Sequence, residues 1–285
     1  MKGIILSYHS HNIFGDQYQN NDHVAFSKDL ELIHNAGIEI ISVMSMVEKL
    51  NRSRFGVRMD DDDQIYVALT FDDGPVFDYE DFVHPVYGYQ RSFYNHMRSF
   101  REKYGNRIQP GLSATSFVIA SPSARQAMAR SQECGYTFLN DDWLGDKWWK
   151  SAAKTEMLSI ANHSWDHVHP VVPDVAISSY SAIRGDFSVV NSYADASAQI
   201  REAAIFISDK TDGMSVPLFA FPYGHYNRYL IEDYLPNHMD EHGMIAAFSA
   251  DGKYVLARDN RWCLSRFICG FHWKSPADLT AILKG

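Results

Sequence analysis

The sequence is poor in several features that mark common protein classes. Its 285 residues include three cysteines, none in C-x-x-C spacing, so neither a disulfide framework nor a thiolate zinc site is expected. No stretch approaches the roughly 18 uninterrupted apolar residues of a membrane-spanning helix. The N-terminal apolar run is too short for a signal-peptide core and stops at His9, so we expect a first strand there and a cytoplasmic protein.

Basic residues are also scarce. There are 26 Lys and Arg against 35 Asp and Glu, a formal net charge of −9. Such a surface is poorly suited to phosphate backbones or anionic membranes, so nucleic acid is not an expected partner. Charged residues make up 21% and apolar residues 46%, which is ordinary for a folded globular protein and excludes wholesale disorder.

Short apolar strands alternate with amphipathic helices along the chain. Strands are expected at 38–43, 65–71, 114–119, 157–162, 218–221, 244–248 and 264–268. Helices are expected at 45–50, 92–103, 123–130, 197–210 and, with Ser275 as its cap, up to Leu283.

This order implies parallel strands joined by crossover helices. Because no glycine-rich nucleotide turn follows any strand, an α/β barrel is favoured over a dinucleotide-binding sheet. A barrel of this length is commonly one domain, so we expect a single domain over 1–285. Three loops, 76–91, 134–156 and 168–190, are longer than a scaffold needs and are candidates for function.

The first chemical motif is Thr70-Phe71-Asp72-Asp73-Gly74-Pro75, where an apolar strand runs into a tight turn. Successive side chains of an extended segment point in different directions, so one carboxylate can bind a metal while its neighbour faces the substrate as a base. A bare D-D-G is also a common way to begin a loop, and by itself it decides little.

The second motif, His163-x-x-x-His167, follows another apolar strand. Histidines four apart meet on one helical turn, which would place two imidazoles within reach of one cation. With a carboxylate at a neighbouring strand end they form a three-ligand catalytic site, and the Asp/His set accepts zinc, cobalt, nickel or iron.

The third motif is Phe221-Pro222-Tyr223-Gly224, again at a strand end. The three motifs, in this order, resemble those of the polysaccharide deacetylases with the NodB-homology fold, carbohydrate esterase family 4. The resemblance covers about residues 3 to 270 and includes the opening Tyr8-His9-Ser10. It implies a deformed (β/α) barrel and a hydrolase that uses one divalent metal, with zinc the first expectation.

The resemblance also implies roles for single residues. Asp72 matches the catalytic base, whereas Asp73, His163 and His167 match the metal ligands. The backbone N–H of Tyr223 matches the donor to the oxyanion. The side chains expected against the substrate are those of Pro222, Tyr223, Trp165 and His9.

The sequence departs from the family pattern in two places. The arginine that often precedes the Pro-Tyr-Gly motif is replaced by apolar residues 218–221, and the late Leu-x-His motif of the acid histidine is not clearly present. Arg266 is the candidate for the missing charge beside Asp72. His272, just after the last strand, is the first candidate for the acid, and His9 is the second.

The expected activity is hydrolysis of the N-acetyl group of an acetamido sugar in a poly- or oligosaccharide. Hydrolysis of another linear or cyclic amide, such as a ureide or imide, is an alternative enzyme activity. The second alternative is a non-catalytic relative that binds saccharides. Such a protein is expected to have lost Asp72 or to have a broken metal triad, and the sequence shows neither.

Three tryptophans have two possible roles. Trp143, Trp148 and Trp149 are either core residues or a face for sugar rings.

Overall fold

The computed structural model describes residues 1–54, 64–131, 142–177 and 183–285. The beginning of the expected loop 134–156 and the middle of the loop 168–190 lie outside the described residues, as does Cys134. No helix of the described part is long and apolar enough to cross a membrane.

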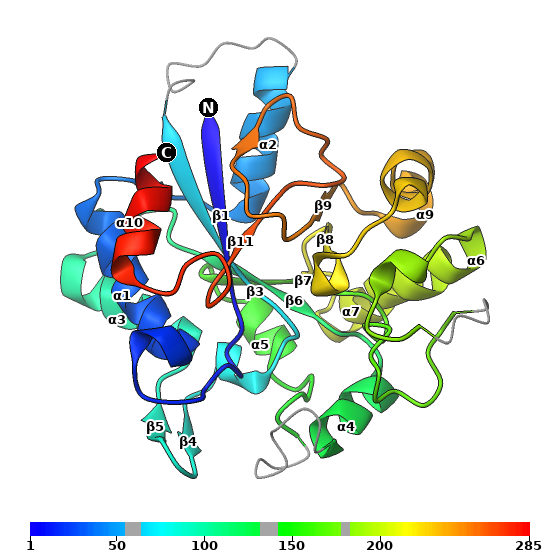
Figure 1. Cartoon of the computed structure of the whole chain (residues 1–285), viewed down its shortest axis with the longest axis horizontal. Coiled ribbons are helices and arrows are strands. Elements are labelled where there is room, and N and C mark those ends of the chain that lie inside the picture. Colours follow the sequence, from blue (N-terminus) through cyan, green and yellow to red (C-terminus); the bar gives the residue numbers. More distant parts are fainter. Residues whose placement is uncertain (55–63, 132–141, 178–182) are drawn as a thin grey trace.

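A curled sheet forms the centre of the molecule (Figure 1). Six parallel strands lie side by side, and their order across the sheet is the same as their order along the chain. They are β1 (Lys2–Tyr8), β3 (Ile65–Phe71), β6 (Ala114–Val118), β7 (Leu158–Asn162), β8 (Leu218–Ala220) and β9 (Ala246–Phe248). Their apolar residues are buried almost throughout, as expected of parallel strands covered on both faces.

Residues 264–268 connect the two ends of this sheet. Leu264 forms a parallel bridge with Phe248 of β9, and β11 (Phe267–Ile268) pairs in parallel with β1. The sheet therefore curls back toward its first strand, which confirms the expected deformed α/β barrel. Two short strands complete it: β2 (Glu39–Ile40) pairs with β3, and β10 (Val255–Leu256) is antiparallel to β1.

Helices cover the outside of the sheet (Figure 1). The longer ones are α1 (Asp22–Asn35), α2 (Val43–Arg54), α3 (Phe93–Tyr104), α4 (Pro122–Arg130), α7 (Glu202–Lys210) and α10 (Pro276–Lys284). The shorter ones are α5 (Trp149–Ala153), α6 (Tyr193–Ala196), α8 (Leu235–Asn237) and α9 (Met239–His242). The side chains of Asn21, Ser92, Ser121 and Ser275 accept backbone N–H bonds at the starts of α1, α3, α4 and α10.

Two local expectations needed correction. Residues 76–91, expected as a loop, contain the hairpin of β4 (Phe82–His84) and β5 (Gly88–Gln90). The segment 38–43, expected as one strand, keeps only the two residues of β2 before α2 begins at Val43. In both places pairing partners decide whether a short β-like sequence becomes a strand.

The strand residues alternate between two apolar clusters. Val67, Leu69 and Phe71 of β3 belong to the cluster that packs under the outer helices, whereas Ala68 belongs to a second cluster with Phe117. Side chains two apart share a face of a strand, so Thr70 and then Asp72 continue the row of Ala68. Asp72 therefore enters the site on the same side of the sheet as Phe117.

Candidate active site

A cavity of about 750 Å³ opens at the carboxyl ends of the parallel strands. Most of the residues proposed from the sequence line it: His9, Asp72, Asp73, His163, His167, Tyr223 and Arg266. They follow or precede five different strands, which explains why residues far apart in the sequence converge here.

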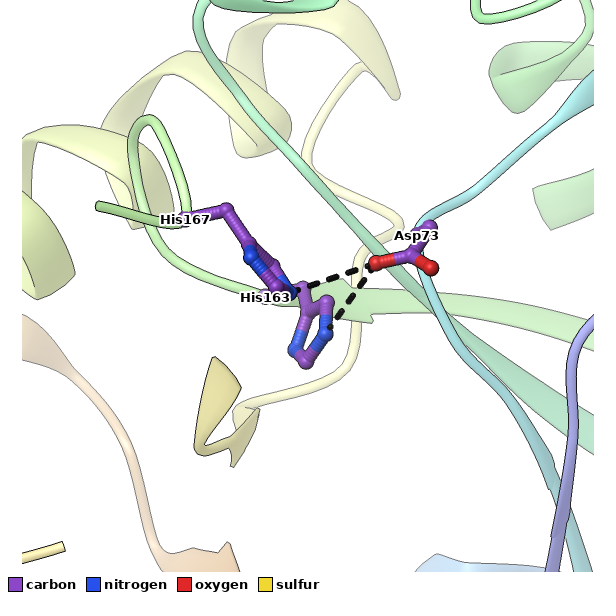
Figure 2. Close-up of side chains that lie close together, drawn as sticks. All are labelled: Asp73, His163 and His167. Carbon is purple, nitrogen blue, oxygen red and sulfur yellow. Dashed lines mark ion pairs between the residues drawn. The ribbon is translucent and has the colours of Figure 1, made fainter. Parts of the chain in front are cut away.

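Asp73, His163 and His167 form one cluster (Figure 2). Oδ1 of Asp73 lies 3.5 Å from Nε2 of His163 and 3.3 Å from Nε2 of His167. Ligand atoms about 2.1 Å from a tetrahedral ion lie about 3.4 Å from one another, so these spacings fit a shared divalent cation.

The two imidazoles are presented by a loop. Strand β7 ends at Asn162, and both Ser164 and His167 have positive φ values of 72° and 62°. The helical turn expected for the His-x-x-x-His spacing was therefore wrong, although the two rings do meet, with centroids 4.9 Å apart. Nδ1 of His163 lies 2.9 Å from the carbonyl of Ala220, and an N–H donated there leaves the lone pair of Nε2 for a ligand bond.

Backbone strain concentrates at this site. Among the described residues, six other than glycine have positive φ, and five of these belong to the motif loops: Asp73, Ser164, His167, Val168 and Tyr223. Such conformations cost free energy for residues with a β-carbon and tend to persist where geometry serves function.

The protonation states suit metal binding. Burial lowers the pKa of His163 and brings the pKa of His167 to about 3, so both rings are neutral near pH 7. Burial by itself raises the pKa of Asp73, but the surrounding histidines outweigh it and hold that pKa well below its ordinary value. One anion and two neutral imidazoles are the forms that a divalent cation requires.

Asp72 is held by Arg266. Nη1 and Nη2 of the buried guanidinium donate to the two carboxylate oxygens at 2.6 and 2.9 Å. The same guanidinium reaches the hydroxyls of Ser7 and Thr70 and lies 5.3 Å from the ring centre of Phe117. Burial raises the pKa of Asp72, but Arg266, together with His163 and His9, more than offsets this and leaves the pKa below its ordinary value, so the carboxyl stays ionised.

The two candidates for the acid occupy different places. Nε2 of His9 lies 3.9 Å from Oδ2 of Asp72, and His9 lines the cavity. His272 is not among the lining residues. Its Nδ1 accepts a hydrogen bond from the backbone N–H of Ile268 at 2.8 Å, and its ring meets the ring of Phe271 edge to face.

The aromatic residues proposed as substrate contacts occupy different environments. Trp143 lines the cavity, but Trp148 and Trp149 are buried in the apolar core under the helices. Trp165 packs on Phe206 and is not among the lining residues. Pro222 is likewise buried beside the cavity and is not part of its lining, whereas the ring of Tyr223 lies edge to face with that of His167.

Several lining residues were missed in the sequence, and three of them stand out: Phe14, Phe271 and His11. Phe14 and Phe271 are unusually exposed for phenylalanine, at 66% and 76%. His11 lies two residues after His9, with Nε2 3.7 Å from Oδ2 of Asp73, and burial lowers its pKa to about 4. The alternation in Tyr8-His9-Ser10-His11 was a usable signal for His11. No sequence pattern marked the two phenylalanines.

Comparison with known proteins agrees with this site. The family model described as polysaccharide deacetylase matches residues 60–237, more than half of the chain, and the chain belongs to that family. Membership supports carbohydrate deacetylation, a hydrolytic reaction on an amide. The matched region includes Asp72, Tyr223 and the cluster of Asp73, His163 and His167, whereas His9, Arg266 and His272 lie outside it.

Solved structures share the fold over nearly the whole chain. The Streptococcus pyogenes deacetylase PplD, in complex with acetate, is 17% identical with a TM-score of 0.60, covering 100% of this chain and 99% of that one. IcaB from Ammonifex degensii is 14% identical, also at 0.60, with coverages of 100% and 97%. The BpsB deacetylase domain from Bordetella bronchiseptica is 15% identical at 0.53, with coverages of 94% and 96%. Comparison with curated proteins finds no significant match.

Proposed function

We propose that residues 1–285 form a single-domain, metal-dependent hydrolase that removes N-acetyl groups from an acetamido sugar of a poly- or oligosaccharide. The convergence of Asp73, His163 and His167 beside the ionised Asp72, in one cavity, carries this proposal. A triad of three protein ligands with open positions is the arrangement of catalytic rather than structural metal sites.

Asp73, His163 and His167 would hold one divalent ion. The mixed nitrogen and oxygen set favours zinc, and cobalt, nickel or iron would also fit. Once bound, such an ion polarises a carbonyl oxygen and makes water more acidic.

Asp72 takes the proton from the attacking water. Its carboxylate stays anionic because Arg266 holds both oxygens, and the same two bonds fix its orientation toward the cavity. The backbone N–H of Tyr223 donates to the oxygen that becomes negative as the acetamide carbonyl is attacked. The positive φ of 59° at Tyr223 belongs to the turn that presents this N–H.

His9 is the residue that we assign as the proton donor to the departing amine. It lines the cavity beside Asp72, whereas the ring of His272 is engaged with the backbone of Ile268. Histidine is the side chain that most often transfers a proton in such steps.

His9→Ala should lower kcat by about 10²-fold, the lower end of the range for general acid catalysis. The loss should shrink for an acetanilide-type substrate whose leaving amine has a low pKa and hardly needs the proton. Steady-state kinetics on both substrates test this, with His272→Ala as the matched control. Equal losses for both leaving groups, or a larger loss in His272→Ala, would remove His9 from this role.

Phe271 and Phe14 should bind sugar rings next to the one that is deacetylated. An exposed aromatic face that lines the cavity suits the C–H face of a pyranose, and aromatic contacts are worth about 1 kcal/mol. Phe271→Ala should therefore raise KM for acetylated oligosaccharides several-fold and leave a monosaccharide substrate unaffected. The exposed Tyr193, on α6, serves as control position. A KM that rises equally for both substrates would contradict this.

Acetate release tests the whole proposal. Purified protein should release acetate from N-acetylated oligosaccharides, lose this activity to a chelator and regain it with a divalent ion. Parallel measurement of ring-opening products from cyclic ureides and imides distinguishes the alternative amide hydrolase. Saccharide binding without any product would identify a non-catalytic relative.

A further inference from the structure

The segment that follows β1 brings two histidines to the two catalytic carboxylates. His9 faces Oδ2 of Asp72 at 3.9 Å, and His11 faces Oδ2 of Asp73 at 3.7 Å. The mechanism above uses His9 and leaves His11 without a role. The rings of His9 and His11 are in edge-to-face contact, with centroids 5.5 Å apart.

Buried polar groups hold this segment from three sides. The backbone N–H of His9 donates to Oδ2 of Asp22 at 2.8 Å, and the hydroxyl of Ser10 donates to Oδ1 of Asp78 at 2.5 Å. The carbonyl of Ser10 accepts from Nε2 of His23 at 2.7 Å. All of these partners are at most 5% exposed. Burying so many polar groups is costly, and it pre-organises the two flanking imidazoles.

The two oxygens of Asp73 have different neighbours. Oδ1 faces Nε2 of both His163 and His167, whereas Oδ2 faces Nε2 of His11. The candidate cation cluster found among the described residues contains Asp73, His163 and His167 and does not extend to His11. His11 therefore faces the second oxygen of this carboxylate and lies outside the cluster of the three candidate ligand atoms.

We propose that His11 is a positioning residue for Asp73: its Nε2–H holds Oδ2, so that the carboxylate binds the metal through Oδ1 alone. This rests on the metal site of the proposed function. A movement of about half an ångström would turn the present contact into a hydrogen bond. Partners that hydrogen-bond a metal ligand from behind typically contribute 10–100-fold to metal affinity.

The test is a competition between the protein and a chromophoric chelator for Zn²⁺. His11→Ala should bind Zn²⁺ about tenfold more weakly than the unmodified chain. His11→Gln, whose amide N–H can reach a similar point, should recover most of that affinity. The control is His238→Ala. His238 contacts Tyr234 and Glu241 and does not line the cavity, so this variant should bind Zn²⁺ as the unmodified chain does. Circular dichroism establishes that each variant is folded.

X-ray absorption on the Zn²⁺-loaded protein provides a second measurement that does not depend on activity. The unmodified chain should show two imidazoles, and His11→Ala should keep both while the carboxylate changes from one-oxygen to two-oxygen binding. Unchanged affinity in a folded His11→Ala would overturn the inference. Three imidazoles, falling to two in His11→Ala, would make His11 a ligand and overturn it as well. Failure of the unmodified chain to bind Zn²⁺, or any other divalent ion, would instead refute the metal site itself.

Discussion

Asp72→Asn should lower kcat by about 10³-fold while the protein keeps its metal, because the amide cannot accept the proton of the attacking water. A divalent ion should still bind, since Asp72 is not one of the three clustered side chains that we propose as its ligands. Acetate release under saturating substrate, together with metal analysis of the same preparation, measures the two properties separately. Undiminished turnover would exclude Asp72 as the base.

This variant needs a control for stability. The Asp72 and Arg266 side chains are buried, and removal of one charge from a buried pair typically costs about 3–5 kcal/mol because the other charge is left unpaired. Asp72→Asn combined with Arg266→Gln removes both charges and so restores part of that stability. If the chemical role is correct, turnover stays low in the double variant while thermal stability rises. A recovery of turnover together with stability would show that the single variant failed through folding.

His163→Ala should weaken divalent metal binding by more than about 100-fold, since an inner ligand contributes more than the 10–100-fold typical of its outer hydrogen-bond partners. Acetate release should fall with it at limiting metal. The hydrogen bond to Ala220 orients this ring for metal binding, and alanine removes both the ring and its lone pair. Chelator competition and metal analysis give the affinity.

The matched control for this variant is His169→Ala. His169 lines the same cavity and its ring lies 5.9 Å from that of His167, but it is not part of the ion cluster. Its replacement should leave metal affinity nearly unchanged. Equal losses in His163→Ala and His169→Ala would mean that the ion sits elsewhere in the cavity.

Much of the site followed from the sequence because its motifs are local. Asp72, Asp73 and His163 come directly after, or within two residues of, apolar strands, and parallel strands bring their carboxyl ends to one edge. The resemblance to the family then predicted the role of base for Asp72 and the role of metal ligand for Asp73. The expected link between Arg266 and Asp72 was harder to foresee, since 194 residues separate them, and here the geometry provides two direct hydrogen bonds.

The sequence was not sufficient to predict which side chains point into the cavity. His272 follows the last strand closely, but the turn at residues 269–272 brings its ring back onto the N–H of Ile268, outside the cavity lining. His11 was not part of the predicted site, and its position there depends on the hydrogen bonds that the neighbouring Ser10 makes with Asp78 and His23. Trp148 and Trp149 carry the same local signal as Trp143, yet of these three buried rings only that of Trp143 lines the cavity.

The sequence by itself therefore determined the strand ends, the order of the motifs and the chemical types that meet there, because short-range patterns set the strands and parallel pairing aligns their ends. Only the tertiary structure decided which side chains face the cavity. That choice depends on turn conformations, including the positive φ values of Asp73, His167 and Tyr223, and on buried partners from distant segments. Such partners are invisible in local sequence because a hydrogen bond across the fold leaves no periodic pattern along the chain.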